Sequence, residues 1–206
     1  MYGVLAILAA FAAWGAVHSA TASLGAKARA RRWLGARTAD GWYRLAYNAF
    51  SILTFLPIMA LVPLLPDQPL YALPALALAA TVPLQLLAAL ALLVALWQVD
   101  LPAFLGLPQA ARWLRGAPEP EQPPTLFTGG AYAWVRHPLY FFGLVIIWLT
   151  PVMTVNVLAF NAGATLYLYI GALFEERKLV REYGDAYRAY QRRVPMLLPR
   201  RPAARV

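Results

Sequence analysis

The side chains best able to do chemistry in this chain gather in two short stretches, VRHPLYFFG and FEERK. The first stretch supplies a guanidinium, an imidazole and a phenol from Arg136, His137 and Tyr140. The second supplies two adjacent carboxylates, Glu175 and Glu176. Brought together, these groups offer cationic, aromatic and anionic partners to a small charged ligand.

Each of these groups also has an ordinary structural explanation. Arg136 can extend its charge to water from a helix end, His137 can cap a helix, and the glutamates can pair with Arg177 and Lys178. Adjacent residues point about 100° apart on a helix, so we expect one glutamate to face the protein and the other to face water. The sequence leaves open which one does so. The conjunction of all these groups favours a functional site.

The elements that position these residues are membrane helices. Hydrophobic residues make up 61% of the 206 residues and charged residues only 13%, against about 25% charged residues in a typical soluble domain. A helix needs about 20 apolar residues to cross a bilayer. Apolar runs occur at about 2–22, 45–65, 71–98 and 138–174.

The fourth apolar run is too long for one crossing. It holds 37 residues, and Pro151 and Asn156 interrupt it, which is typical of two helices joined by a tight turn. The sequence therefore predicts an all-α integral membrane protein with five transmembrane helices, the last two forming a tight hairpin. That hairpin would return Glu175 and Glu176 to the membrane face at which Arg136 and His137 begin the fourth span.

The placement of basic residues supports five crossings. Of the eighteen Lys and Arg, six lie in or beside 23–44, three lie within 99–137 and nine follow residue 174. With five crossings all eighteen fall on one face and Asp67 lies on the other, so the positive-inside rule makes the basic face cytoplasmic. We expect a multi-pass protein, in a bacterial inner membrane, with its N-terminus outside and its C-terminus cytoplasmic. The first run lacks a basic leader and is expected to be a span, not a cleaved signal.

The chain after the hairpin has a helical period. Apolar and tyrosine residues recur every three or four positions from Leu179 to Val194, with charges between them, and Pro195 follows. This pattern predicts a cytoplasmic amphipathic helix that ends before the proline. The segment before the hairpin, 99–137, is rich in proline and is expected to be a cytoplasmic loop.

Several classes of site are excluded. The chain has no cysteine, so thiol catalysis, disulfides and thiolate metal sites are ruled out. It has no P-loop, HExxH or GxSxG motif, and its two isolated histidines cannot form a zinc site alone. The net charge of +9 has no nucleic-acid reading motif beside it, so we expect a lipid bilayer as partner, with no nucleic acid and no metal.

RHPLY, followed about 35 residues later by FEERKLVREYGDAYRAYQRRVP, resembles a known family. It is the family of integral-membrane methyltransferases that includes isoprenylcysteine carboxyl methyltransferase, phospholipid methyltransferases and methanethiol S-methyltransferase. The resemblance covers about residues 124–199. The chain departs from the family pattern at Phe142, where glycine is usual, and at Ala131, where proline often follows the loop glycine.

The resemblance implies S-adenosylmethionine as methyl donor. The implied pocket lies in 138–206, the hairpin and C-terminal helix, with help from the loop at 99–137, whereas 1–98 forms a three-span region on the acceptor side. His137 and Arg136 would bind the donor's carboxylate, and Glu175 or Glu176 would bind its ammonium or ribose. The implied cofactor-binding residues are Gly130, Tyr132, Arg136, His137, Tyr140, Glu175, Glu176 and Tyr183.

Methyl transfer is an in-line displacement, so no nucleophilic side chain is required. Tyr187 and Arg193 are the candidates to position or polarise the acceptor. The acceptor is expected to be lipid-soluble, either a small thiol or a lipidic molecule, and to meet residues of the first three spans. Those candidates are His18, Tyr43, Tyr47 and Asn48. The alternative, from a fainter resemblance, is a non-catalytic NnrU-like membrane protein that keeps the hairpin for assembly. The oligomeric state stays open.

Overall fold

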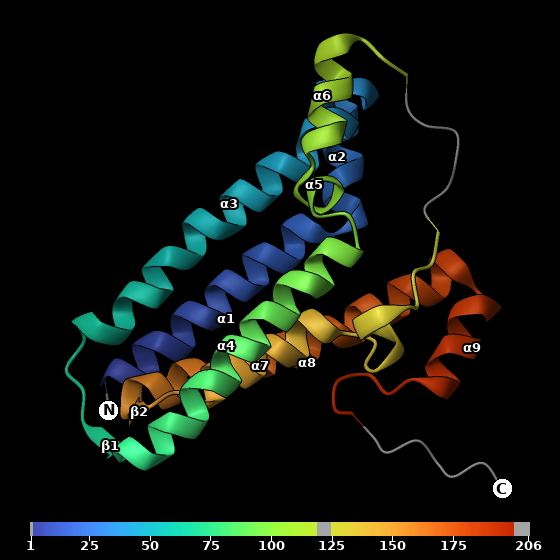
Figure 1. The fold of residues 1–206 in the computed structure, drawn as a ribbon. Helices are drawn as coiled ribbons and strands as arrows, with labels where there is room; N and C mark the ends of the chain where they lie inside the picture. The colour runs from blue at the N-terminus through green and yellow to red at the C-terminus, as the bar shows by residue number, and fades with distance from the viewer. Residues whose placement is uncertain (1, 119–124, 200–206) are drawn as a thin grey trace, which may run out of the picture. The chain divides into compact units, whose positions relative to one another are not determined.

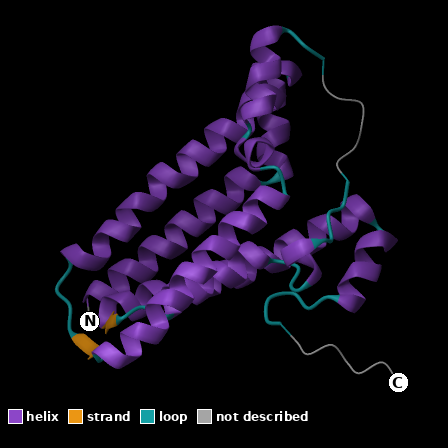
Figure 2. Cartoon of the chain, viewed as in Figure 1, coloured by secondary structure: helices purple, strands orange, loops and turns teal. Residues whose placement is uncertain are grey.

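The computed structural model describes residues 2–118 and 125–199, which are almost entirely helical (Figures 1 and 2). Two short strands, β1 and β2, form the sheet in the described part of the chain. The elements in chain order are α1 (Tyr2–Ala22), α2 (Leu24–Leu34), α3 (Ala36–Leu64), β1 (Pro69–Ala72), α4 (Ala75–Gln98), α5 (Leu101–Leu105), α6 (Leu107–Arg115), the 3₁₀ turn η1 (Gly130–Ala133), α7 (Pro138–Trp148), β2 (Val152–Thr154), α8 (Val155–Tyr183) and α9 (Asp185–Arg193).

The chain folds as two compact units. The first unit comprises Met1–Leu70, Asp100–Pro123 and Thr154–Gly163. The second unit comprises Tyr71–Val99, Pro124–Met153 and Ala164–Val206. The chemistry-bearing residues of RHPLY and FEERK therefore all belong to the second unit.

Four helices are long and apolar enough to cross a membrane, namely α1, α3, α4 and α8, with 21, 29, 24 and 29 residues. Their surfaces are mostly exposed, as lipid-facing helices require. The helical integral-membrane class expected from the sequence is consistent with this structure. Helix α7 has only 11 residues, fewer than the roughly 20 of a straight crossing, so the fifth crossing is not confirmed.

Helices α7 and α8 run in opposite directions in the second unit. Trp148 Nε1 donates to Thr165 Oγ1 at 2.9 Å, and Tyr140 donates to Glu175 Oε2 at 2.9 Å. The residue late in α7 thus contacts the earlier residue of α8, and the residue early in α7 contacts the later one. This antiparallel arrangement returns the end of α8 to the start of α7, as the hairpin prediction requires.

Helix boundaries differ from the sequence expectation at both ends of the chain. α3 begins at Ala36, well before the apolar run, so its first turns carry basic residues. α8 runs without a break past residue 174 to Tyr183, and Gly184, with φ of +55°, separates it from α9. The amphipathic segment is therefore divided between the end of α8 and α9, because a glycine in this conformation interrupts the helix.

The first unit holds the residues expected to meet the acceptor. Tyr47 Oη lies 2.7 Å from His18 Nε2, so these two form one polar pair between α1 and α3. Tyr43 donates instead to the Thr21 carbonyl, and Asn48 donates to the carbonyls of Phe104 and Leu105 at the end of α5. Of these four candidates, His18 and Tyr47 therefore contact each other, whereas Tyr43 and Asn48 donate hydrogen bonds to backbone carbonyls.

Candidate active site

The RHP stretch is held in place by backbone pairing with the chain that follows α9. Arg136 N donates to the Pro195 carbonyl at 2.9 Å and His137 N donates to the Met196 carbonyl at 3.1 Å. Pro138 occupies the first turn of α7, where its missing N–H costs nothing. His137 is the N-cap residue of α7, but its side chain makes no capping hydrogen bond. The imidazole is therefore available to the glutamates of α8.

The Glu176 carboxylate is the centre of a buried network. It accepts hydrogen bonds from Arg136 Nε at 2.9 Å and Nη2 at 2.7 Å, and lies 2.8 Å from His137 Nε2. It also accepts from the Tyr187 hydroxyl and from Gln191 Nε2, each at 2.6 Å. Glu176 is only 7% exposed. Because four side chains of the protein already surround this carboxylate, its hydrogen-bonding positions are taken by partners within the chain.

Arg136 turns inward and does not extend to solvent. Its side chain is 10% exposed in the ion pair with Glu176. Its Nη1 donates to the backbone carbonyls of Gln191 and Val194. Five donors fixed in one plane suit an arginine for such multiple contacts. Arg136 therefore ties the start of α7 to α8, to α9 and to the chain that follows α9.

Glu175 differs from its neighbour in exposure. Its carboxylate accepts from the Tyr140 hydroxyl at 2.9 Å and lies 3.4 Å from His137 Nδ1, yet its side chain is 44% exposed. The sequence predicted that one glutamate faces the protein and one faces water. In the structure Glu176 is the buried side chain and Glu175 is the partly exposed one.

His137 lies between the two carboxylates. It is 5% exposed and stacks on Tyr140 with ring centroids 5.3 Å apart and planes 7° apart. Burial by itself lowers the pKa of His137, but the hydrogen bonds and charges of Glu175 and Glu176 together outweigh it and raise the pKa above its ordinary value. The imidazole therefore favours its charged form, with one nitrogen toward each glutamate.

The raised pKa of His137 predicts that its stabilising effect depends on pH. A group whose pKa is higher in the folded state stabilises fully below its unfolded pKa of about 6.5, and this stabilisation is lost as pH rises through the folded value. The unfolding midpoint of the wild type should therefore exceed that of His137→Gln most clearly at low pH. Thermal unfolding in detergent from about pH 5 to about pH 9 measures this difference. His18→Gln controls for the loss of an imidazole elsewhere, and a His137 difference that does not change with pH would contradict the expectation.

The tyrosines of α9 are buried and protonated. Burial, followed by the hydrogen bond to Glu176, raises the pKa of Tyr187, so its hydroxyl stays a donor. Burial also raises the pKa of Tyr190 to about 12, and its hydroxyl donates to the Tyr132 carbonyl. Burial raises the pKa of Tyr132 as well, and its ring meets Phe127 edge-on at 5.9 Å. The Tyr187 and Tyr190 hydroxyls therefore act as hydrogen-bond donors, and Tyr132 contributes a backbone acceptor and a packing surface.

Position 130 requires a glycine because the Gln98 side chain lies close to its Cα. Its φ is +55°, and a Cβ added there would clash with the side-chain amide of Gln98. Gln98 Oε1 accepts from Ala131 N at 3.1 Å, which fixes the η1 turn against the end of α4. The space above Gly130 is thus filled by a side chain of this chain.

The structure brings most of the expected site residues together. Arg136, His137, Tyr140 and Tyr187 all contact Glu175 or Glu176. Among the residues that the structure describes, Tyr183 and Arg193 form no hydrogen bond with this network, and Arg193 is exposed.

Three participants were missed from the sequence, namely Gln98, Tyr190 and Gln191. Gln191 lies four residues after Tyr187 and so shares its helix face, which was a usable signal. Nothing in the sequence pointed to Gln98.

Comparison with known proteins bears on the same chemistry. The chain is 43% identical over 94 residues to methanethiol S-methyltransferase 1 of Bradyrhizobium diazoefficiens, which is 46% of this chain and 32% of that protein. It is 50% identical over 68 residues to the Mycobacterium tuberculosis enzyme, 33% of this chain and 28% of that protein. It is 43% identical over 82 residues to the Crocosphaera subtropica enzyme, 39% of this chain and 32% of that protein.

These relatives are methanethiol S-methyltransferases. The resemblance to integral-membrane methyltransferases drawn from the motifs is thereby confirmed. The chain spans about a third of the length of the curated relatives it matches. No family model and no solved structure matches the chain.

Proposed function

We propose that this protein is a membrane-embedded methyltransferase that moves a methyl group from S-adenosylmethionine to a small thiol. The names of its relatives support the reaction type. The observation that carries the proposal is Glu175, whose side chain is 44% exposed and whose carboxylate is held by Tyr140 and His137 at the edge of the buried Glu176 network. A carboxylate fixed in this way is ready to bind a ligand cation or a pair of hydroxyls.

The residues present suit the chemistry of S-adenosylmethionine. Its ammonium and ribose hydroxyls need an accessible carboxylate, and Glu175 supplies one. Its own carboxylate needs a cation. Lys178 lies about one helical turn from Glu175, close enough to act on its charge. It is a better candidate than Arg136, which already donates to Glu176 and to the carbonyls of Gln191 and Val194. The rings of Tyr132 and Tyr140 offer aromatic faces for adenine and sulfonium.

In this proposal the Glu176 network positions the site and does not itself bind the donor. Arg136, His137 and Tyr187 would hold Glu176, and His137 would in turn orient Glu175. When bound, S-adenosylmethionine supplies an electrophilic methyl group on a sulfonium. As the thiol sulfur formed its bond to the methyl carbon, the bond between that carbon and the donor sulfur would break, S-adenosylhomocysteine would leave, and the thiol proton would pass to water. The protein's part is to align the two reactants and exclude water.

The acceptor would be a small, lipid-soluble thiol. The relatives are named for methanethiol, whose size and low polarity allow it to reach the site through the bilayer. A lipidic acceptor is the other substrate class expected from the wider resemblance. The names of the relatives favour the thiol.

Donor binding and methyl transfer test this function. The purified protein in detergent should unfold at a higher temperature with S-adenosylmethionine present, because a ligand at 100 times its dissociation constant adds about 2.7 kcal/mol. Radiolabelled donor should then give a volatile labelled thioether with methanethiol, and little label in a lipid extract. Absence of a midpoint shift at millimolar donor would contradict the proposal and favour a non-catalytic membrane protein.

The proposal also includes an orientation in the membrane. We propose five crossings, with α7 as a short one, which place the basic segments in the cytoplasm and Asp67 outside. Reporters fused after Val206 and inserted beside Asp67 should then report opposite sides. Two reporters on the same side would contradict five crossings and leave the four long helices as the spans.

A further inference from the structure

A stripe of exposed apolar side chains runs along one face of α8 in the second unit. The helix carries no charged residue from Val155 to Phe174, which is about the length of one bilayer crossing. In this part Leu166, Ile170 and Phe174 are 60%, 43% and 59% exposed. Because each lies four residues after the one before, all three fall within about 80° around the helix axis. The stripe is therefore a continuous surface on which a lipid acyl chain can lie.

Two arginines continue the stripe where its apolar part ends. Arg177 and Arg181 are both exposed, and both lie within about 60° of Phe174 around the helix axis. The guanidinium carbon of Arg177 lies over the Phe174 ring, 5.6 Å from its centroid. Arg181 Nε donates to the Arg177 carbonyl at 3.4 Å, which directs this side chain back toward the preceding turn. The same helix face thus changes from apolar to cationic within two turns.

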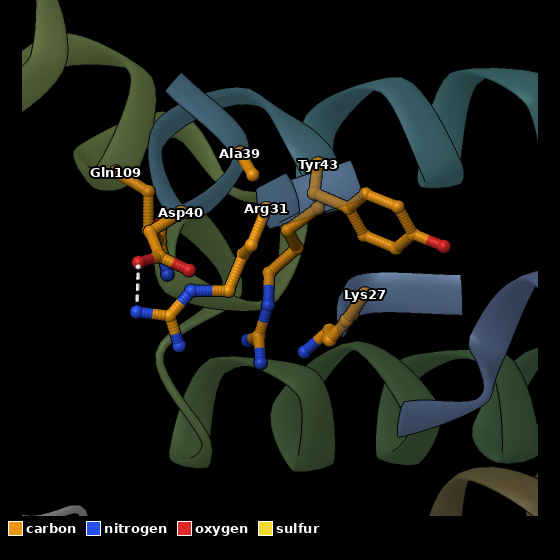
Figure 3. Close-up of a pocket in the computed structure, with 7 residues that line it drawn as sticks. Lys27, Arg31, Ala39, Asp40, Tyr43 and Gln109 are labelled. Carbon is orange, nitrogen blue, oxygen red and sulfur yellow. Dashed lines mark ion pairs between the residues drawn. The ribbon is translucent and has the colours of Figure 1, made fainter. Parts of the chain in front are cut away.

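These two arginines differ from an arginine that has its own carboxylate. In the first unit, Arg31 pairs with Asp40 at 3.3 Å, as Figure 3 shows. In the described part of the chain, Arg177 and Arg181 form no ion pair. Like charges four residues apart on a helix repel each other. An anion bound by both would remove this repulsion, and a phosphate can accept hydrogen bonds from two guanidinium groups at once.

We propose that the cationic end of this stripe binds the headgroup of an anionic phospholipid. Arg177 and Arg181 are the ligands of its phosphate, and an acyl chain lies along Phe174 and Ile170. The apolar stripe favours a lipid over a soluble phosphate, because a free phosphate has no use for that surface.

The proposed binding differs from the general attraction of basic segments to anionic membranes. Its charge complementarity comes from two arginines that share one helix face with the apolar stripe. We therefore expect about one lipid per chain and a dependence on these two residues. The stripe excludes Glu175, Tyr140 and Lys178, so the proposal is independent of the methyltransferase function.

Titration of the purified protein in neutral detergent with short-chain lipids tests the proposal. Native mass spectrometry counts the bound lipids, and the rise in unfolding midpoint reports the affinity. Dioctanoyl phosphatidylglycerol should bind at about one per chain. Dioctanoyl phosphatidylcholine has no net charge and glycerol 3-phosphate has no acyl chains, so each should bind at least about 10-fold more weakly.

Matched variants locate the binding. Arg177→Gln combined with Arg181→Gln should weaken phosphatidylglycerol binding about 10-fold or more, because charged hydrogen-bond donors to the phosphate are lost. Arg188→Gln combined with Arg192→Gln removes the same charge from exposed positions of α9 and should leave binding nearly unchanged. Phe174→Leu stays apolar but removes the ring beneath Arg177, so it should weaken binding about 2-fold to 5-fold. All five positions are exposed, so the lipid-free unfolding midpoints should stay close to that of the wild type.

Four results would overturn the proposal. Unchanged binding in the double variant of Arg177 and Arg181 would mean that the lipid binds elsewhere. Equal weakening by the two double variants would mean general attraction to a basic surface. Equal binding of phosphatidylcholine would mean that the net charge of the headgroup is irrelevant. Equal binding of glycerol 3-phosphate would assign the two arginines to a soluble phosphate.

Discussion

Glu176→Gln is expected to lower the free energy of unfolding by about 3–5 kcal/mol, because removing one partner of a buried ion pair leaves the other charge buried and uncompensated. Arg136 and Glu176 are 10% and 9% exposed in their pair, and His137 is also buried against this carboxylate. Glutamine keeps the shape of the side chain but cannot balance two cations. Chemical unfolding of the detergent-purified protein, followed by circular dichroism, measures the loss.

An exposed ion pair provides the control for Glu176. Asp185 pairs with Arg188 in α9 at 2.9 Å, but the Asp185 side chain is 96% exposed. Asp185→Asn should therefore change stability by no more than about 0.5 kcal/mol. If Glu176→Gln costs no more than Asp185→Asn, the network around Glu176 does not hold the second unit together as inferred.

Glu175→Gln should have the opposite profile, with little effect on stability and a large effect on donor binding. Its side chain is partly exposed, and its carboxylate is proposed to bind the ammonium or the ribose of S-adenosylmethionine. Loss of a hydrogen bond to a charged group is worth about 1.5–3 kcal/mol, which weakens affinity by about 10-fold to 100-fold. Isothermal titration calorimetry with S-adenosylmethionine on the folded variant measures this directly.

Glu182→Gln is the matched control for Glu175. It removes the same charge from the same helix at an exposed position two turns further along α8. Donor affinity should be nearly unchanged in this variant. Equal affinity in Glu175→Gln and the wild type would remove Glu175 from the site, whereas a large drop in Glu182→Gln would indicate a general charge effect on the donor.

The two glutamates show how adjacent residues of one helix meet different surroundings. They point about 100° apart around α8. One direction faces α9 and the RHP stretch, where arginine, histidine, tyrosine and glutamine converge on Glu176. The other direction faces outward past Tyr140, which leaves Glu175 reachable. His137 contacts both carboxylates, so it couples the buried network to the exposed side chain.

Much of this arrangement was predictable from the sequence. Apolar runs of bilayer length identified the long helices, since burying an unpaired backbone group in lipid is costly and favours helices there. Pro151 and Asn156 marked the reversal between α7 and α8, because proline removes a helical donor. The return of the chain placed Glu175 and Glu176 beside Arg136 and His137. The order of the motifs alone established the resemblance that the relatives confirm.

Only the tertiary structure decided which carboxylate is buried and what each cation does. The sequence specifies that two glutamates diverge on a helix, but the choice between them depends on the rotation of α8 against its neighbours, which side-chain packing sets. The same packing brought Tyr187 and Gln191 to Glu176 and engaged four of the five N–H donors of Arg136. It filled the space above Gly130 with Gln98, from a helix about 30 residues away in sequence. The sequence determined that the RHP stretch and the glutamate pair meet, because helix lengths and the reversal between α7 and α8 can be read locally. Contacts between distant segments leave no local period in the chain, so only the fold determined which further side chains join them and which glutamate stays exposed.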